Sequence, residues 1–238
     1  MKILIVSALS WELKPIKDKI KQLKLPIKIN FLTTWMWNYN MILNLQEEII
    51  KNKYDFLINI WSCWYKNKKE DLIQIARIFN ITNQKELLVP IFFKVSKLES
   101  IFCSEKIVSK LDEWFVDMES YWFELVASKY NIPRLILKIP VDEIWNNFDK
   151  NIYIKKLNKA NFEDILKQII DYLKSTPKKE NFDIFFNELN LTFSQKIIFK
   201  RLYYKYSSLI WNFDIFFNEN KNLWRKDFLK LLEEKTNV

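Results

Sequence analysis

The opening stretch of the chain, residues 2–12, reads KILIVSALSWE. Its first six residues are mostly aliphatic, and so short a run predicts a buried β-strand over residues 2–7. The segment that follows, residues 12–23, carries apolar residues at helical spacing, namely Leu13, Ile16, Ile20 and Leu23. A strand that leads directly into an amphipathic helix is the first half of a βαβ unit, so the opening predicts an α/β protein.

The same alternation continues along the chain. A strand over residues 27–33, a helix over residues 40–52 and a strand over residues 54–60 complete a βαβαβ pattern, which predicts a parallel sheet with helices on its faces. The later apolar runs predict strands over residues 72–79, 87–95, 98–103, 115–118 and 135–139, and helices over residues 119–130 and 162–173.

The character of the sequence changes near residue 176. Strand-like runs disappear, and the segment NFDIFFNE of residues 181–188 recurs at residues 212–219. Two copies are too few for a solenoid. We therefore predict one domain over residues 1–175 and a helical extension over residues 176–238. The extension either packs on the domain or forms an oligomer or partner surface, and a homodimer is one such assembly.

The chain of 238 residues contains no glycine and ten tryptophans. A protein of this length has about 17 glycines on average, and tight turns and ligand-cradling loops depend on them. Four tryptophans stand after or at the ends of predicted strands, where glycine loops are expected: Trp35, Trp37, Trp61 and Trp64. We hypothesise that the gene reads UGA as glycine and has been translated with UGA as tryptophan. The alternative is a genuinely tryptophan-rich protein.

Composition excludes several other classes of protein. The net charge is +9, but the lysines are dispersed and arginine, the usual reader of bases, is scarce, so we expect a solvated surface and no nucleic acid. With no histidine, and with Cys63 and Cys103 far apart, we expect no metal site. The first residues do not form a secretory signal, and no apolar run is long enough to span a membrane. We expect a cytoplasmic protein.

Five segments, in order along residues 1–173, resemble the purine nucleoside phosphorylase/nucleosidase superfamily, and most of all its hydrolytic branch, the 5′-methylthioadenosine/S-adenosylhomocysteine nucleosidases. The first is the opening strand with its acidic helix start. The others are TWMW at residues 34–37, NIWSCW at residues 59–64, VDMES at residues 116–120 and IPVDE at residues 139–143. With glycine at the tryptophans, they are similar to the family motifs S-G-I-G, N-T-G-S-A-G, V-x-M-E and A-I-S-D. The resemblance implies a three-layer αβα fold with a mixed central sheet.

The resemblance also implies an enzyme of purine and methionine salvage that hydrolyses the N-glycosidic bond of an adenosine-type nucleoside. By this resemblance, Asp142 protonates the purine and Glu12 activates water on the opposite face of the sugar. Two carboxyl groups with separated pKa values suit these tasks at neutral pH. Glu119 matches the carboxylate that binds ribose, and the other substrate-binding residues are Ser62, Met118 and Ser104. The partner is a small purine nucleoside, and no cofactor is needed.

The position of these residues just after predicted strands supports a single site. In an open parallel sheet, the carboxyl ends of the strands border one crevice. We therefore expect Glu12, Ser62, Glu119 and Asp142 to converge there.

Each of these residues also has an ordinary structural interpretation. An acid at a helix start, such as Glu12, is usually a surface residue that benefits from the helix dipole. Asp142 alone fits a loop cap, and Met118 fits a core. The sequence also departs from the family, because Val141 stands where a serine precedes the catalytic aspartate. A hydrogen bond that would orient the carboxylate is therefore missing.

Two other functions stay open. Phosphorolysis needs cationic groups around phosphate, and no arginine precedes Arg77, so water is the expected nucleophile, although the pair Ser62-Cys63 resembles the phosphorylase loop. The third alternative is a non-catalytic nucleoside-binding or scaffold domain. Val141 and the short segment between Trp64 and Ser104 support it. An assay of purine release with and without phosphate separates all three.

Overall fold

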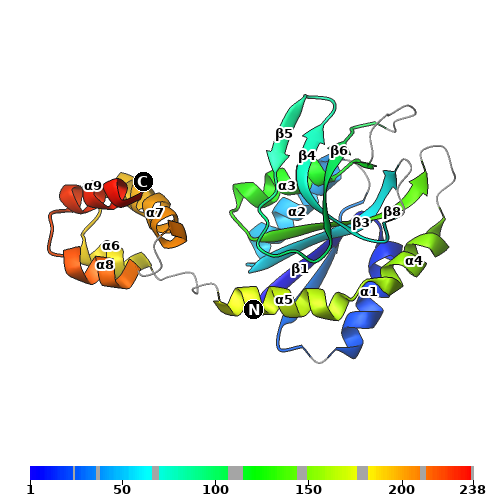
Figure 1. The fold of residues 1–238 in the computed structure, drawn as a ribbon, viewed down its shortest axis with the longest axis horizontal. Coiled ribbons are helices and arrows are strands. Elements are labelled where there is room, and N and C mark those ends of the chain that lie inside the picture. The colour runs from blue at the N-terminus through cyan, green and yellow to red at the C-terminus, as the bar shows by residue number, and fades with distance from the viewer. Residues whose placement is uncertain are drawn as a thin grey trace. The chain divides into compact units, whose positions relative to one another are not determined.

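The computed structural model describes residues 1–23, 25–35, 38–65, 70–106, 115–143, 149–175, 182–209 and 213–236. The chain divides into two compact units, Met1–Thr176 and Pro177–Val238 (Figure 1). Within the described residues, no helix is both long and apolar enough to cross a membrane.

The first unit opens with the predicted βαβαβ pattern. Its strand β1 pairs in parallel with β2 on one side and with β3 on the other, so the predicted parallel sheet is confirmed here. The five elements are β1 (Lys2–Ser7), α1 (Ser10–Gln22), β2 (Lys28–Thr33), α2 (Asn38–Lys51) and β3 (Phe56–Tyr65).

The rest of the unit completes a mixed sheet of eight strands. The later elements are β4 (Ile73–Asn80), β5 (Lys85–Leu88), β6 (Lys97–Cys103), β7 (Phe115–Asp117), α3 (Ser120–Lys129), β8 (Arg134–Glu143), α4 (Lys150–Lys159) and α5 (Phe162–Ser175). The strand order is β2-β1-β3-β7-β6-β4-β5, and β8 pairs with both β3 and β4. The pairings β3–β7, β4–β5 and β4–β8 are antiparallel. The path from β3 through β8, β4, β6 and β7 returns to β3, so this part of the sheet closes on itself.

Helices cover both faces of the sheet, as the alternation of side chains along β1 requires. Leu4 and Val6 pack in one core with residues of α2 and α3. Ile3 and Ile5 point to the other face and pack with residues of α1, α4 and α5. The three-layer αβα architecture with a mixed sheet is therefore confirmed (Figure 1).

The sequence prediction fails in detail at four places. The predicted strand over residues 54–60 does not end in a loop at Trp61 and Trp64, because β3 continues to Tyr65 through its pairing with β8. The predicted strand over residues 87–95 is wrong, because β5 ends at Leu88 and Pro90, which lacks an N–H donor, follows it. Helix α4 was not predicted, since Tyr153 and Leu157 are its only buried residues and give too weak a periodicity. Strand β8 continues past its predicted end to Glu143, because it pairs with β3 over that length.

The second unit is helical, as predicted. It consists of α6 (Phe182–Glu188), α7 (Phe193–Leu209), α8 (Phe213–Asn220) and α9 (Arg225–Thr236). The two NFDIFFNE copies supply α6 and α8, and their phenylalanines face each other, with the rings of Phe185 and Phe217 centred 4.6 Å apart. Both copies thus build one aromatic core.

Candidate active site

Glu12 lies at the carboxyl end of β1, in the first turn of α1. Its Oε2 accepts hydrogen bonds from Ser7 Oγ at 2.7 Å and from the Leu9 backbone N at 3.0 Å. Its Oε1 accepts from the backbone N and Oγ of Ser62 at 3.2 and 3.0 Å. The carboxylate therefore joins the ends of β1 and β3. The interpretation of Glu12 as a surface residue is wrong, because only 1% of it is exposed.

Burial is the main influence on the pKa of the Glu12 carboxyl group. Desolvation raises the pKa of its carboxyl group, and the hydrogen bonds from Ser7, Leu9 and Ser62 lower it, with burial the larger effect. A raised pKa makes the ionised carboxylate a stronger base.

Glu119 lies beyond the end of β7, at the start of α3, and is buried. Its Oε2 accepts a hydrogen bond from the backbone N of Met118 at 3.3 Å. Burial, followed by the charge of Asp117, raises the pKa of Glu119 to about 8; the charge of Glu12 also raises it and that of Lys138 lowers it. Glu12 and Glu119 thus belong to one electrostatic environment.

A buried ion pair lies close to Glu119, and the sequence interpretation missed it. The Nζ atom of Lys138 is 2.6 Å from Asp117 Oδ2 and 3.7 Å from the centre of the Trp61 ring. Trp61 Nε1 donates to the same Asp117 oxygen at 3.1 Å, and Ser120 also donates to it. A signal was available, because a lysine inside the apolar run of residues 135–139 requires a buried partner.

Asp142 lies in β8 with its backbone opposite Trp64 of β3. The register shifts between Cys63 and Trp64, beside Pro140, which cannot donate to the ladder. The backbone of Asp142 is thereby placed beyond the level of Ser62, toward the carboxyl end of β3. Its side chain lies outside the described residues, so its part in the site stays a prediction.

The other predicted substrate-binding residues border the same region. Met118 is buried between Asp117 and Glu119. Ser104 is also buried, and its backbone N donates to the carbonyl oxygen of Asp117 at 2.8 Å. The loop after β6 therefore contacts the end of β7.

The four tryptophans at the predicted glycine positions differ in environment. Trp35 has φ of 63° and is 61% exposed. Trp61 is buried within β3, and Trp64 is half-buried beside the register shift. Trp37 lies outside the described residues.

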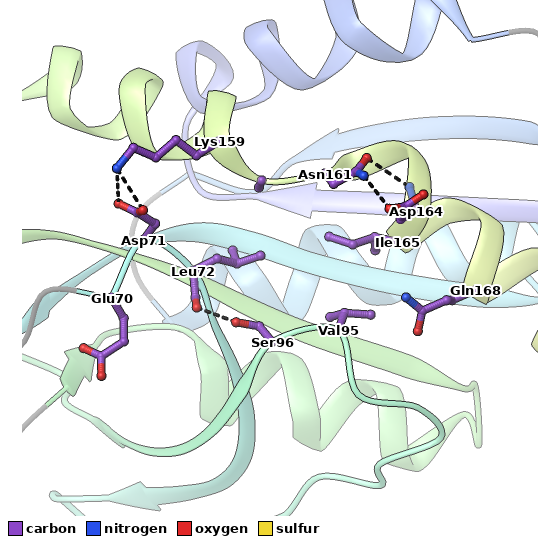
Figure 2. A pocket seen from close by; sticks show the side chains of 11 residues that line it. Glu70, Asp71, Leu72, Val95, Ser96, Lys159, Asn161, Asp164, Ile165 and Gln168 are labelled. Carbon is purple, nitrogen blue, oxygen red and sulfur yellow. Dashed lines mark hydrogen bonds and ion pairs between the residues drawn. The ribbon is translucent and has the colours of Figure 1, made fainter.

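Two surface cavities of about 430 and 460 Å³ lie elsewhere, along α4 and α5. Figure 2 shows the first, in which Lys159 pairs with Asp71 and the side chain of Asn161 donates to Asp164. No predicted site residue lines either cavity. Within the described part of the chain, no group of three or more cysteine, aspartate or glutamate side chains is arranged to hold a metal ion.

No protein-family model matches the sequence, and no curated protein matches it. The fold, however, is similar to that of solved MTA/SAH nucleosidases. One such structure has a TM-score of 0.58 at 13% identity and covers 74% of this chain and 96% of its own. MTAN from Chlamydia trachomatis bound to MTA has a TM-score of 0.55 at 15% identity, over 70% of this chain and 98% of its own. Apo 5′-methylthioadenosine nucleosidase from Arabidopsis thaliana has a TM-score of 0.55 at 13% identity, over 74% of this chain and 97% of its own. At these identities, the similarity establishes the fold.

Proposed function

We propose that this chain is a purine nucleosidase that hydrolyses the N-glycosidic bond of an adenosine-type nucleoside such as 5′-methylthioadenosine or S-adenosylhomocysteine. The observation that carries the proposal is the buried Glu12 carboxyl group, which accepts four hydrogen bonds from β1, β3 and the start of α1. Its charge also raises the pKa of Glu119. The nucleosidase fold supports it.

In this proposal, the residues divide the work of the reaction. Glu12, ionised and held by Ser7 and Ser62, accepts a proton from the attacking water. Glu119 accepts hydrogen bonds from the ribose hydroxyls, since one carboxylate can serve two adjacent hydroxyls. Asp142 donates a proton to the purine as the bond to the sugar breaks.

The arginines favour water over phosphate as the nucleophile. Residues 1–175 contain only Arg77 and Arg134. Arg77 pairs with Glu86 at the surface, and Arg134 pairs with the buried Glu124, so both guanidinium groups are engaged away from Glu12. A bidentate clamp for phosphate is therefore not expected.

The test is purine release from 5′-methylthioadenosine, with and without inorganic phosphate. Hydrolysis predicts a rate that does not depend on phosphate. Release only with phosphate would establish phosphorolysis instead, and binding without release would establish a non-catalytic domain. We further propose that the enzyme is a cytoplasmic homodimer of purine and methionine salvage, which sedimentation and fractionation can check.

We also propose that the tryptophans stand for glycine in the native protein. Trp35 supports this, because its φ of 63° is in the left-handed region, which is costly for a residue with a Cβ atom. The backbone of Trp61 does not support it, because this residue lies within β3 and packs in the core. The neighbours of its indole do support it. The indole lies against Asp117 and Lys138, and the side-chain amide of Asn59, two residues away on the same face of β3, makes no hydrogen bond within the described residues.

With glycine at position 61, the space of the indole is lined by core residues and by Asp117 and Lys138, whose polar groups can bind water or a ligand. Mass spectrometry of the native peptides decides the question, and tryptophan at positions 35, 37, 61 and 64 would reject the hypothesis. The second measurement is nucleoside binding by Trp61→Gly. We expect tighter binding than by the chain as written, and equal binding would show that the indole does not obstruct the site.

A further inference from the structure

Lys138 is a fully buried cation in the middle of a strand. It has no exposed surface and lies in β8 between the buried residues Leu137 and Ile139. An isolated ammonium group in such a place is very unfavourable, so a partner is required. That partner is Asp117, whose Oδ2 is 2.6 Å from Lys138 Nζ. The pair joins β8 to β7 inside the closed part of the sheet.

This ion pair lies close to Glu119 and is connected through Trp61 to the strand that holds Glu12. Asp117 is two residues before Glu119, and Trp61, which donates to Asp117, directly precedes Ser62, which donates to Glu12. Neither Asp117 Oδ1 nor Lys138 Nζ makes a hydrogen bond within the described part of the chain. The pair is therefore held in place by Oδ2 alone.

The charges around Glu119 do not balance when all carboxyl groups are ionised. Among the described residues, Asp117 of β7, Glu12 of α1 and Lys138 of β8 act on it, and Cys103 of β6 faces it as a buried thiol. Burial and the charge of Asp117 raise the pKa of Glu119 to about 8, and Glu12 raises it too. Lys138 is the group that lowers it. The two members of the pair thus act on Glu119 in opposite directions.

We propose that Asp117 and Lys138 are positioning residues whose opposite charges set the ionisation of the Glu119 carboxyl group, and thereby how strongly it accepts hydrogen bonds from ribose. An ionised carboxylate has two free acceptor oxygens, whereas a protonated one gives part of that capacity to its own O–H group. The ribose part rests on the proposed function; the ionisation part does not.

The test is a titration of Glu119 in the full chain by NMR, with ¹³C in the glutamate carboxyl groups and the signal assigned through Glu119→Gln. Lys138→Met should move the midpoint up by about one pH unit or more, and Asp117→Asn should move it down by a similar amount. Lys138→Arg keeps the charge and should restore the midpoint. Lys97→Met, which removes an exposed lysine of β6, is the matched control and should leave it unchanged.

Opposite shifts in the two variants confirm the proposal, and a midpoint that neither variant moves overturns it. If Lys138→Met does not fold, the double variant Lys138→Met with Asp117→Asn removes both charges and leaves no unpaired ion. Its midpoint should then lie above that of Asp117→Asn alone, and equality of the two would overturn the proposal.

The ribose part is read from the pH dependence of 5′-methylthioadenosine binding. The pH at which binding strengthens should follow the Glu119 midpoint in each variant. Binding that does not change with the midpoint would reject the role in ribose recognition and leave the ionisation result standing. Failure of the proposed function would show as absent purine release, whatever the titrations give.

Discussion

Two buried ion pairs connect β8 to the segment that contains β7 and α3, and they differ in how fully their charges are satisfied. At the start of β8, the Arg134 guanidinium binds Glu124 of α3 through Nε, at 2.8 Å, and through Nη2. It also donates to Ser128 Oγ and to the carbonyl oxygen of Ile132. All three guanidinium nitrogens of Arg134 therefore donate hydrogen bonds, as a buried bidentate pair requires.

Farther along β8, the pair of Lys138 and Asp117 is incomplete. Asp117 Oδ1 and Lys138 Nζ are buried without a hydrogen bond in the described part of the chain. Natural proteins rarely leave such groups unsatisfied away from functional sites. The first pair therefore fixes α3 on the sheet, whereas the second leaves polar atoms without hydrogen bonds close to Glu119.

The largest expected effect is on the rate of purine release and concerns the proposed catalytic carboxylate. Glu12→Gln should reduce the rate of purine release by about 10²–10⁴-fold, because an amide cannot accept a proton from water. The measurement is single-turnover release, and Glu163→Gln, on the outer face of α5, is the control. A rate close to that of the unmodified chain in Glu12→Gln would assign Glu12 a structural role and end the comparison.

The next effect concerns the complete pair. Arg134→Met should destabilise the first unit by about 3–5 kcal/mol, since Glu124 is left buried without its partner. Unfolding in urea measures this. The double variant Arg134→Met with Glu124→Leu should recover much of the loss. A change below about 1 kcal/mol in the single variant would show that this pair does not hold α3.

A third effect is the pH dependence of stability through Glu119. The pKa of Glu119 is about 8 in the folded state, and its ordinary value, taken for the unfolded state, is 4.5. Between these two pH values the folded state therefore binds more protons than the unfolded state. Stability contributed by the protonated group therefore declines as pH rises from about 4.5 to 8. Urea unfolding at pH 6 and 8.5 should show this decline, and Glu119→Gln should weaken it. An equal decline in both proteins would contradict the assignment.

The smallest effect concerns the loop after β2. Trp35→Gly should stabilise the first unit by about 1 kcal/mol, because glycine adopts the left-handed conformation without the Cβ penalty. Trp224→Gly is the matched control, since Trp224 is also exposed but has no positive φ. Thermal unfolding compares the two, and equal changes would remove the conformational argument.

The sequence predicted the strands and helices that carry strong local patterns. The opening βαβαβ units follow from apolar periodicity and from the right-handed crossover of parallel strands. The antiparallel pairing of β4 with β8, which closes the sheet, could not be predicted, because it joins residues far apart in the chain and leaves no local pattern.

The candidate site shows the same division. Glu12 and Glu119 were named because their segments resemble family motifs next to strands, and their roles stay predictions. Lys138 was not, because its chemistry depends on Asp117, a partner 21 positions earlier that only the folded sheet brings within 2.6 Å. A lysine inside an apolar run indicates that a buried partner is needed, but the sequence does not indicate which residue that partner is.

The pairing of β3 has a consequence for local opening. This strand pairs with β1 at residues 56–59, with β7 at Trp64 and Tyr65, and with β8 from Leu57 to Tyr65. It therefore has strand partners on both sides except at residues 60–63, where β8 alone pairs with it and the N–H of Ser62 donates to Glu12 instead. Amide hydrogen exchange should accordingly be slowest in β3 and fastest in the edge strand β5. Ser62, which donates two hydrogen bonds to Glu12, belongs to β3. Opening of the edge strands therefore leaves these hydrogen bonds to the carboxylate intact.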